Sequence, residues 1–209
     1  MSVFPKEADL FVIAVGGSSK KSGKTRVASR LIQALKIDCA VKVSAGEHYF
    51  PDREIIEDPD IIRQPGTDTA RYVAAGAKRV IWIDTIGANM PHAIGSLNSL
   101  CKDCETVLIE SNSAIPLIRS DFTVFIAGAN PSEFKESALS VVRIADLICI
   151  NGNAFVDKRG NQNIFEALVA LNGNAKIAWC ENEEECASTA IQILNVVFGC
   201  RKNKKGPMA

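Results

Sequence analysis

Residues 16–25 read GGSSKKSGKT, and they join an apolar run, Leu10 to Val15, to a segment whose apolar residues recur at helical spacing. A strand, a glycine-bearing loop ending in Gly-Lys-Thr and a helix together form the arrangement that holds nucleotide phosphates. Glycine allows backbone angles at which successive N–H groups turn inward onto an oxyanion. The N-terminus of the following helix adds unpaired donors and a partial positive charge. The stretch therefore predicts a phosphate-binding loop.

The loop supplies the candidate nucleotide-binding residues, namely Gly17, Ser22, Gly23, Lys24, Thr25 and Arg26. We expect Lys24 to reach the outer phosphates as a point charge and to act in catalysis, and the Thr25 hydroxyl to ligate Mg²⁺. Five residues, Ser18 to Ser22, separate Gly17 from Gly23, whereas the common pattern has four. The longer loop indicates a subgroup of this class, and its flanking strand and helix disfavour an ordinary surface turn.

Composition limits the class of protein. The chain has 209 residues, a length that suits one α/β domain, 1–209, with a sizeable core. Its 24 Lys and Arg residues equal its 24 Asp and Glu residues, so overall charge gives no reason to expect a nucleic-acid or membrane partner. No apolar stretch approaches the ~18 residues of a membrane span, and the first residues do not resemble a signal peptide. We expect a cytoplasmic protein whose basic tail, 200–209, is solvated.

Strand-like and helical segments alternate along the chain. After the first apolar run, strands are expected at 39–43, 79–84, 106–110, 122–127, 146–151 and 175–180. Helices are expected after the phosphate-binding loop and at 69–75, 91–100, 131–144, 164–171 and 183–198. The alternation predicts an α/β fold, a three-layer P-loop NTPase architecture with a mostly parallel sheet of about seven strands. Ligands of such sheets bind at the carboxyl ends of the strands.

Charged residues stand where three of these strands end. Glu110 closes an apolar strand and leads into Ser111 and Asn112, a position from which an acid places Mg²⁺ opposite a phosphate loop, directly or through water. Asp84 ends another strand and competes for this role, but the run before Glu110 is more apolar. Lys42 breaks the second strand near its carboxyl end, where it would meet a phosphate or an acidic substrate, or else lie on an exposed edge.

The end of the sixth strand bears on the choice of nucleotide base. Asn151 stands there, in a position to hydrogen-bond the edge of a purine. Guanine-selective enzymes of this class commonly place an aspartate three positions later, where this chain has Ala154, and Asp157 lies too far along for the same geometry. The choice between GTP and ATP therefore stays open.

The connection 44–67 is long for a compact domain and carries several acidic residues. Connections of this length tend to be functional lids or mobile segments. It contains His48, one of only two histidines, and a lone loop histidine is usually neither a ligand nor a base.

The seven cysteines are an odd number, which argues against a disulfide framework. Cys149 and Cys180 lie in strand-like runs, and we expect them to be small core residues. Cys101 and Cys104 form a lone CxxC, a candidate metal site that lacks a second pair or a nearby histidine.

Residues 64–77 read QPGTDTARYVAAGA and resemble the segment that follows the long second loop of MobB-type proteins, the molybdopterin-guanine dinucleotide biosynthesis adaptors. In that family an acid and an arginine precede Ala-Gly-Ala, as Asp68 and Arg71 do here. Lys42 and Glu110 match the lysine and the acid that end two strands of the family. The resemblance implies a P-loop GTP-binding protein that acts as a homodimer.

The chain also departs from that family. Thr67 stands where a lysine is usual, Ser111 where a glycine is expected, and residues 43–45 replace histidines. The five-residue spacing of the phosphate loop, together with the same lysine and acid, is instead similar to dethiobiotin synthetase, an ATP-dependent carboxylase of the same broad class. The resemblance covers roughly residues 10–112.

The first functional hypothesis is a MobB-like adaptor. It would bind Mg²⁺ and GTP, hydrolyse GTP slowly, and help a partner enzyme deliver or elaborate the molybdenum cofactor. The phosphate loop and Glu110 would hold the phosphates and the metal. Asp68 and Arg71 would line the nucleotide-facing edge, although Arg71 fits a surface helix equally well.

Two other hypotheses belong to different functional classes. In an ATP-dependent small-molecule ligase or kinase, Lys42 would bind the carboxylate or carbamate acceptor, while Lys20 and Lys21 would neutralise transferred charge. In a metallochaperone NTPase, Cys101 and Cys104 would bind the metal.

Overall fold

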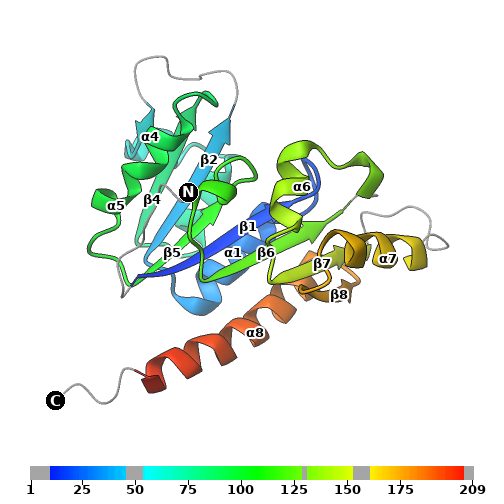
Figure 1. Cartoon of the computed structure of the whole chain (residues 1–209). Helices are drawn as coiled ribbons and strands as arrows, with labels where there is room; N and C mark the ends of the chain where they lie inside the picture. Colours follow the sequence, from blue (N-terminus) through cyan, green and yellow to red (C-terminus); the bar gives the residue numbers. More distant parts are fainter. Residues whose placement is uncertain (1–9, 46–53, 129–130, 153–160, 205–209) are drawn as a thin grey trace.

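The computed structural model describes residues 10–45, 54–128, 131–152 and 161–204. Figure 1 shows one sheet crossing the molecule, with helices packed on both faces. The strands are β1 (Phe11–Gly17), β2 (Cys39–Ala45), β3 (Ile55–Ile56), β4 (Arg79–Thr85), β5 (Thr106–Glu110), β6 (Phe122–Ala127), β7 (Leu147–Asn151) and β8 (Lys176–Cys180). The helices are α1 (Lys24–Leu35), α2 (Pro59–Ile62), α3 (Asp68–Ala74), α4 (Met90–Gly95), α5 (Leu97–Leu100), α6 (Glu136–Val142), α7 (Asn161–Leu171) and α8 (Glu183–Lys204), with 3₁₀ turns η1 (Ile115–Leu117) and η2 (Pro131–Glu133).

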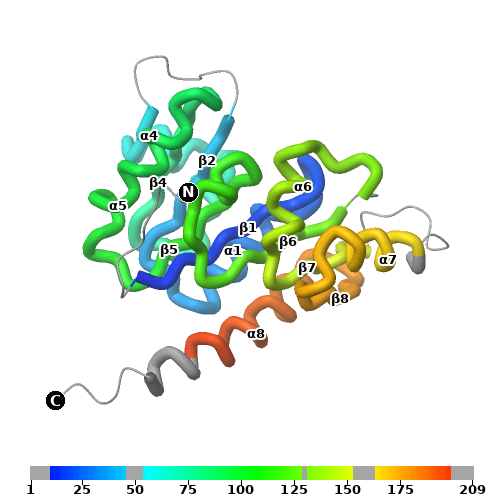
Figure 2. The backbone as a smooth tube through the Cα atoms, viewed as in Figure 1, coloured from blue at the N-terminus to red at the C-terminus, as the bar shows by residue number. Residues whose placement is uncertain are grey.

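The sheet is almost wholly parallel. Its strand order is β3-β4-β2-β5-β1-β6-β7-β8, and β3 is the antiparallel member among the described strands. β1 lies between β5 and β6, so the strand that leads into the phosphate loop occupies the interior of the sheet. Figure 2 traces the alternation of strand and helix along the backbone. The predicted α/β fold is confirmed, but the expected seven strands omit β3, whose two residues are too few to produce a periodic pattern.

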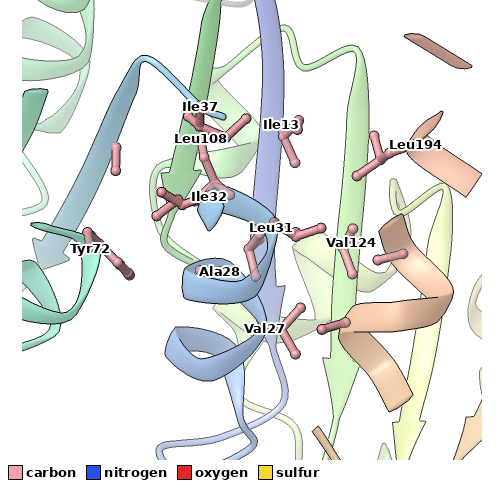
Figure 3. Close-up of a cluster of buried hydrophobic side chains, with 14 of the residues drawn as sticks. Ile13, Val27, Ala28, Leu31, Ile32, Ile37, Tyr72, Leu108, Val124 and Leu194 are labelled. Carbon is pink, nitrogen blue, oxygen red and sulfur yellow. The ribbon is translucent and has the colours of Figure 1, made fainter. Parts of the chain in front are cut away.

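Alternate residues of β1 point into different helix layers. Ile13 and Val15 belong to a buried cluster with residues of α1, α3 and α8, whereas Val12 packs with residues of α4 and α5 on the opposite face. Val27 and Leu31 project from α1 into the first cluster (Figure 3). A third cluster packs α6 and α7 against β6 and β7. The three layers therefore follow from the two-residue period of side chains on strands that are buried on both faces.

The helix expected over 131–144 begins later than predicted. Its first residues form the 3₁₀ turn η2, and α6 starts only at Glu136. Between the two, Phe134 is buried and packs against Phe125, with the ring centroids 5.5 Å apart. Burying this aromatic side chain takes precedence over the local signal of a proline near the start of a helix.

Other boundaries also differ from expectation. The helix predicted at 91–100 is divided into α4 and α5, which meet at Ser96. α8 continues to Lys204, so the first half of the predicted basic tail is helical. The described part of the connection 44–67 contains the end of β2, the short strand β3 and helix α2 rather than a continuous loop.

The start of α3 depends on a side-chain cap. The Thr67 hydroxyl accepts a hydrogen bond from the Ala70 amide at 3.1 Å. Thr67→Ala should lower the free energy of unfolding by about 1 kcal/mol, because this amide loses its partner. Urea denaturation measures the change. Ser188→Ala is the control, since the Ser188 hydroxyl donates only to a carbonyl within its own helix. Equal stability of the two variants would show that the cap contributes nothing.

Candidate functional site

A cleft of about 1470 Å³ opens at the carboxyl edge of the central strands. Its walls come from the loop after β1, the ends of β2 and β5, helix α3 and the start of α8. Predicted site residues line it, namely Gly23, Lys24, Thr25, Arg26, Lys42, Asp68, Arg71 and Glu110. The other three, Gly17, Ser22 and Asn151, are buried beside this lining. The fold thus brings residues from distant parts of the sequence to one place.

The backbone of the phosphate loop requires glycine at two positions. Gly23 has a φ of 102°, and a Cβ there would lie 2.5 Å from the Glu183 Cγ. A Cβ at Gly17 would lie 2.5 Å from the Ser22 Oγ. Within the longer loop, Lys21 adopts a left-handed conformation with a φ of 73°. Side chains disfavour this region, so the surrounding structure must hold the loop in place.

Residues that follow the two neighbouring strands anchor the loop. The Gly17 amide donates to the Asn112 Oδ1 at 2.9 Å, and the Asn112 Nδ2 donates to the Gly17 carbonyl at 2.7 Å. On the other side, the Gly128 amide donates to the Ser18 hydroxyl at 2.8 Å. The sequence placed Asn112 in a polar loop without assigning it a role. The position of Asn112 directly after an apolar strand is the feature of the sequence that could have identified it as a site residue.

Glu110 is the centre of a network that joins four elements. Its side chain is 1% exposed, and its Oε1 accepts from the Lys42 Nζ at 2.6 Å. The same ammonium lies 2.8 Å from the Asp68 Oδ2. The Tyr72 hydroxyl donates to the Glu110 Oε2, and the Thr25 hydroxyl lies 3.4 Å from Oε1. Tyr72 was missed by the sequence analysis, although it lies one helical turn after Asp68.

The pKa shifts in this network follow from burial and pairing. Burial alone lowers the pKa of Lys42, but Glu110 and Asp68 beside it raise that pKa overall. Burial raises the pKa of Asp68, but its contact with Lys42 brings that pKa below the usual 3.8. The Asp68 contact therefore stabilises the fold above about pH 3.8 and loses this effect as the pH falls through the lower folded-state pKa.

The loop and Glu110 offer a donor set for phosphate and Mg²⁺. The Lys24 ammonium donates to the Ser19 carbonyl at 2.5 Å, and burial lowers the pKa of Lys24. The Thr25 hydroxyl and the Glu110 carboxylate, 3.4 Å apart, are oxygen donors of the kind that Mg²⁺ takes. Because Lys42 already occupies the Glu110 Oε1, this carboxylate fits a contact with a metal-bound water better than direct ligation.

Asn151 links the phosphate loop to α8. Its Nδ2 donates to the Ser22 carbonyl at 3.1 Å and to the Glu183 Oε1 at 3.1 Å. Its Oδ1 is buried and has no hydrogen-bond partner in the described part of the chain. Arg26 lies 3.6 Å from the Glu183 Oε2 and reaches toward α8. Glu183 could not be assigned from the sequence, because its placement depends on how α8 docks.

The remaining candidates occupy less central positions. Arg71 is largely exposed at the edge of the cleft, and Asp84 is buried in its lining. The positions considered for base recognition, Ala154 and Asp157, lie outside the described residues, as does His48.

The CxxC cysteines lie away from the cleft. Cys101 is buried and Cys104 half-buried, and both contact the thiol of Cys39 at the amino end of β2. The hydrogen bond from Cys39 lowers the pKa of Cys104 to about 7. Cys149 and Cys180 are buried, as predicted.

No protein-family model and no curated protein matches this sequence. Within the described residues, no helix combines the length and apolar character that a membrane span requires.

Two solved structures share the fold of the chain. HypB from Helicobacter pylori, solved in complex with nickel, matches with a TM-score of 0.58 at 15% identity over 96% of this chain and 92% of that one. The hydrogenase maturation factor HypB from Archaeoglobus fulgidus matches with a TM-score of 0.57 at 17% identity over 90% of each chain. The chain therefore has the α/β fold of the P-loop NTPases.

Proposed function

We propose that this protein binds Mg²⁺ and GTP and hydrolyses GTP slowly, as a MobB-like adaptor in molybdenum cofactor biosynthesis. The observation that carries the nucleotide assignment is the convergence of Lys24, Thr25 and Glu110 in one cleft at the carboxyl edge of the sheet. The likeness of residues 64–77 to MobB-type proteins supports the finer assignment. A homodimer and a partner that handles the molybdenum cofactor are parts of this proposal.

The chemistry would rest on position and charge. Lys24 and the loop amides would neutralise the phosphates, and the Thr25 hydroxyl would ligate Mg²⁺. Glu110, held by Lys42 and Tyr72, would orient a water on the metal.

The preference for GTP rests on the family resemblance. The Asn151 Oδ1 offers an acceptor that suits an N–H donor of either purine. Arg71 and Asp68 would line the edge of the site, 3.7 Å from one another.

An ATP-dependent ligase or kinase is the second candidate, and the size of the cleft favours it. The volume of about 1470 Å³ exceeds the roughly 300–1,000 Å³ of a typical ligand pocket, which leaves room for an acceptor beside the nucleotide. Lys20 and Lys21 line the cleft and would meet transferred charge. Lys42 is less suited to bind the acceptor, because two carboxylates already hold its ammonium.

A metallochaperone NTPase is the third candidate, resting on Cys101 and Cys104. Cys39 adds a third thiol beside them. Metal affinity that survives Cys101→Ala with Cys104→Ala would remove this candidate.

Phosphate release from GTP in the presence of Mg²⁺ tests the proposal. The wild-type protein should hydrolyse GTP slowly, and hydrolysis should stop when EDTA removes the metal. Glu110→Gln should reduce the rate about 10- to 100-fold, as loss of a group that orients a metal-bound water typically does. Asp103→Asn, at an exposed acid outside the cleft, should leave the rate unchanged. A Glu110→Gln variant with the wild-type rate would refute the assigned role of Glu110.

A further inference from the structure

Three buried cysteines from separate elements converge beside the nucleotide cleft. Cys149 belongs to β7, Cys180 ends β8, and Cys186 lies at the start of α8. Their Sγ atoms all lie within 4.8 Å of one another, and all three residues are 0% exposed. In the described ranges, no other trio of cysteine, histidine or acidic side chains comes this close. None of the three sulfurs has a part in nucleotide binding.

The spacing suits a single ion with sulfur ligands. Metal–thiolate bonds of about 2.3 Å hold neighbouring sulfurs roughly 4 Å apart, so small rotations of the side chains would complete the site. Apart from hydrogen bonds among the three thiols themselves, which a metal would replace, the sulfurs have only long contacts. The Cys149 Sγ lies 3.7 Å from the Cys186 carbonyl, and the Cys180 Sγ lies 4.0 Å from the Thr189 hydroxyl. A metal would therefore displace no strong hydrogen bond.

The surroundings favour one kind of ion. Thiolates select soft metals, chiefly Cu(I) and Zn²⁺. Structural Zn²⁺ sites are closed by four ligands, but the three cysteines belong to a buried apolar cluster with Ala187 and Ala190, and the polar side chain beside them is the Thr189 hydroxyl. Neither a fourth sulfur nor an imidazole is found in this group. A dry site with three sulfurs suits Cu(I), which does not need a fourth ligand.

We propose that Cys149, Cys180 and Cys186 bind one Cu(I) ion through their three sulfurs. Each thiol that coordinates the ion releases its proton to solvent, and the copper stays monovalent throughout.

The bound ion would join β7, β8 and α8. Cys149 is two residues from Asn151, and Cys186 is three residues from Glu183. These two neighbours already connect α8 to the phosphate loop. Copper binding should therefore stabilise the folded chain by mass action, seen as a rise in the melting temperature.

The test is an anaerobic competition titration of the reduced, full-length protein with Cu(I) and a chromogenic Cu(I) chelator, without nucleotide. We expect one tightly bound Cu(I) per chain, a higher melting temperature and three sulfur neighbours by X-ray absorption. Cys180→Ala and Cys186→Ala should each weaken the affinity by about 100-fold. Ser188→Ala, at an exposed residue two positions from Cys186 on the same helix, is the matched control and should keep the wild-type affinity.

Three results would overturn the proposal. The first is that the Cys180 and Cys186 variants bind Cu(I) as tightly as the wild type does. The second is that the control variant loses Cu(I) affinity and these two variants do not. The third is that a parallel titration shows tighter binding of Zn²⁺ than of Cu(I). If the two variants do not fold, X-ray absorption on the wild-type protein decides, and fewer than three sulfur ligands would contradict the site. Because nucleotide is absent, the outcome is independent of the proposed function.

Discussion

Lys24→Ala should abolish measurable nucleotide binding and leave the fold intact. In the proposed function Lys24 meets the outer phosphates, so its removal would leave their negative charge without a partner. The ammonium bonds to Ser19 and Ser22, so the hydrogen bonds that the substitution breaks lie within the loop. We expect the dissociation constant to rise at least about 100-fold, equivalent to ~2.7 kcal/mol. Calorimetric titration measures the affinity, and circular dichroism checks the fold.

Lys102→Ala is the control for this result. Lys102 is exposed and does not line the cleft, so removing its charge should leave the affinity unchanged. Normal nucleotide affinity in Lys24→Ala would refute the assignment of residues 16–25 as a phosphate-binding loop.

Lys42→Met should destabilise the protein by about 3 kcal/mol, because breaking a buried ion pair leaves a charge without compensation. Glu110, at 1% exposure, would keep only its hydrogen bonds from Tyr72 and Thr25. Methionine retains most of the apolar stem of lysine, so the change chiefly removes the charge. Denaturant unfolding measures the loss.

A paired substitution separates the charge effect from packing. Glu110→Gln combined with Lys42→Met removes both charges, and the double variant should recover part of the stability lost in Lys42→Met alone. Lys78→Met is the control, because Lys78 pairs with Asp38 at the surface, where screening by water leaves little net effect. Equal destabilisation by Lys42→Met and Lys78→Met would contradict the buried network.

The sequence predicted the framework well because its signals are local. An apolar strand, a Gly-Lys-Thr loop and an amphipathic helix are contiguous, and each parallel strand forms its own apolar run. The rule that ligands bind at the carboxyl ends of strands then placed Lys42 and Glu110 in the cleft, where both are found.

The site residues that were not predicted from the sequence depend on contacts between segments that are distant along the chain. Tyr72 reaches Glu110 only because α3 packs against β4 and β2. Glu183 approaches Gly23 because α8 crosses α1. Likewise Cys186 joins Cys149 through the docking of α8, so no spacing along the chain marks the cluster. The short strand β3 was missed because its two residues give no periodic pattern, and the break at Phe134 was missed because packing there overrides local propensity.

Isothermal titration of GTP and of ATP, each with Mg²⁺, against the purified protein tests the central claim most directly. We expect GTP to bind with a clear preference over ATP, and we expect Lys24→Ala to abolish the binding signal. A clear preference for ATP would contradict the MobB-like assignment and favour the ligase or kinase. Absence of binding by either nucleotide would contradict the account of the cleft as a whole.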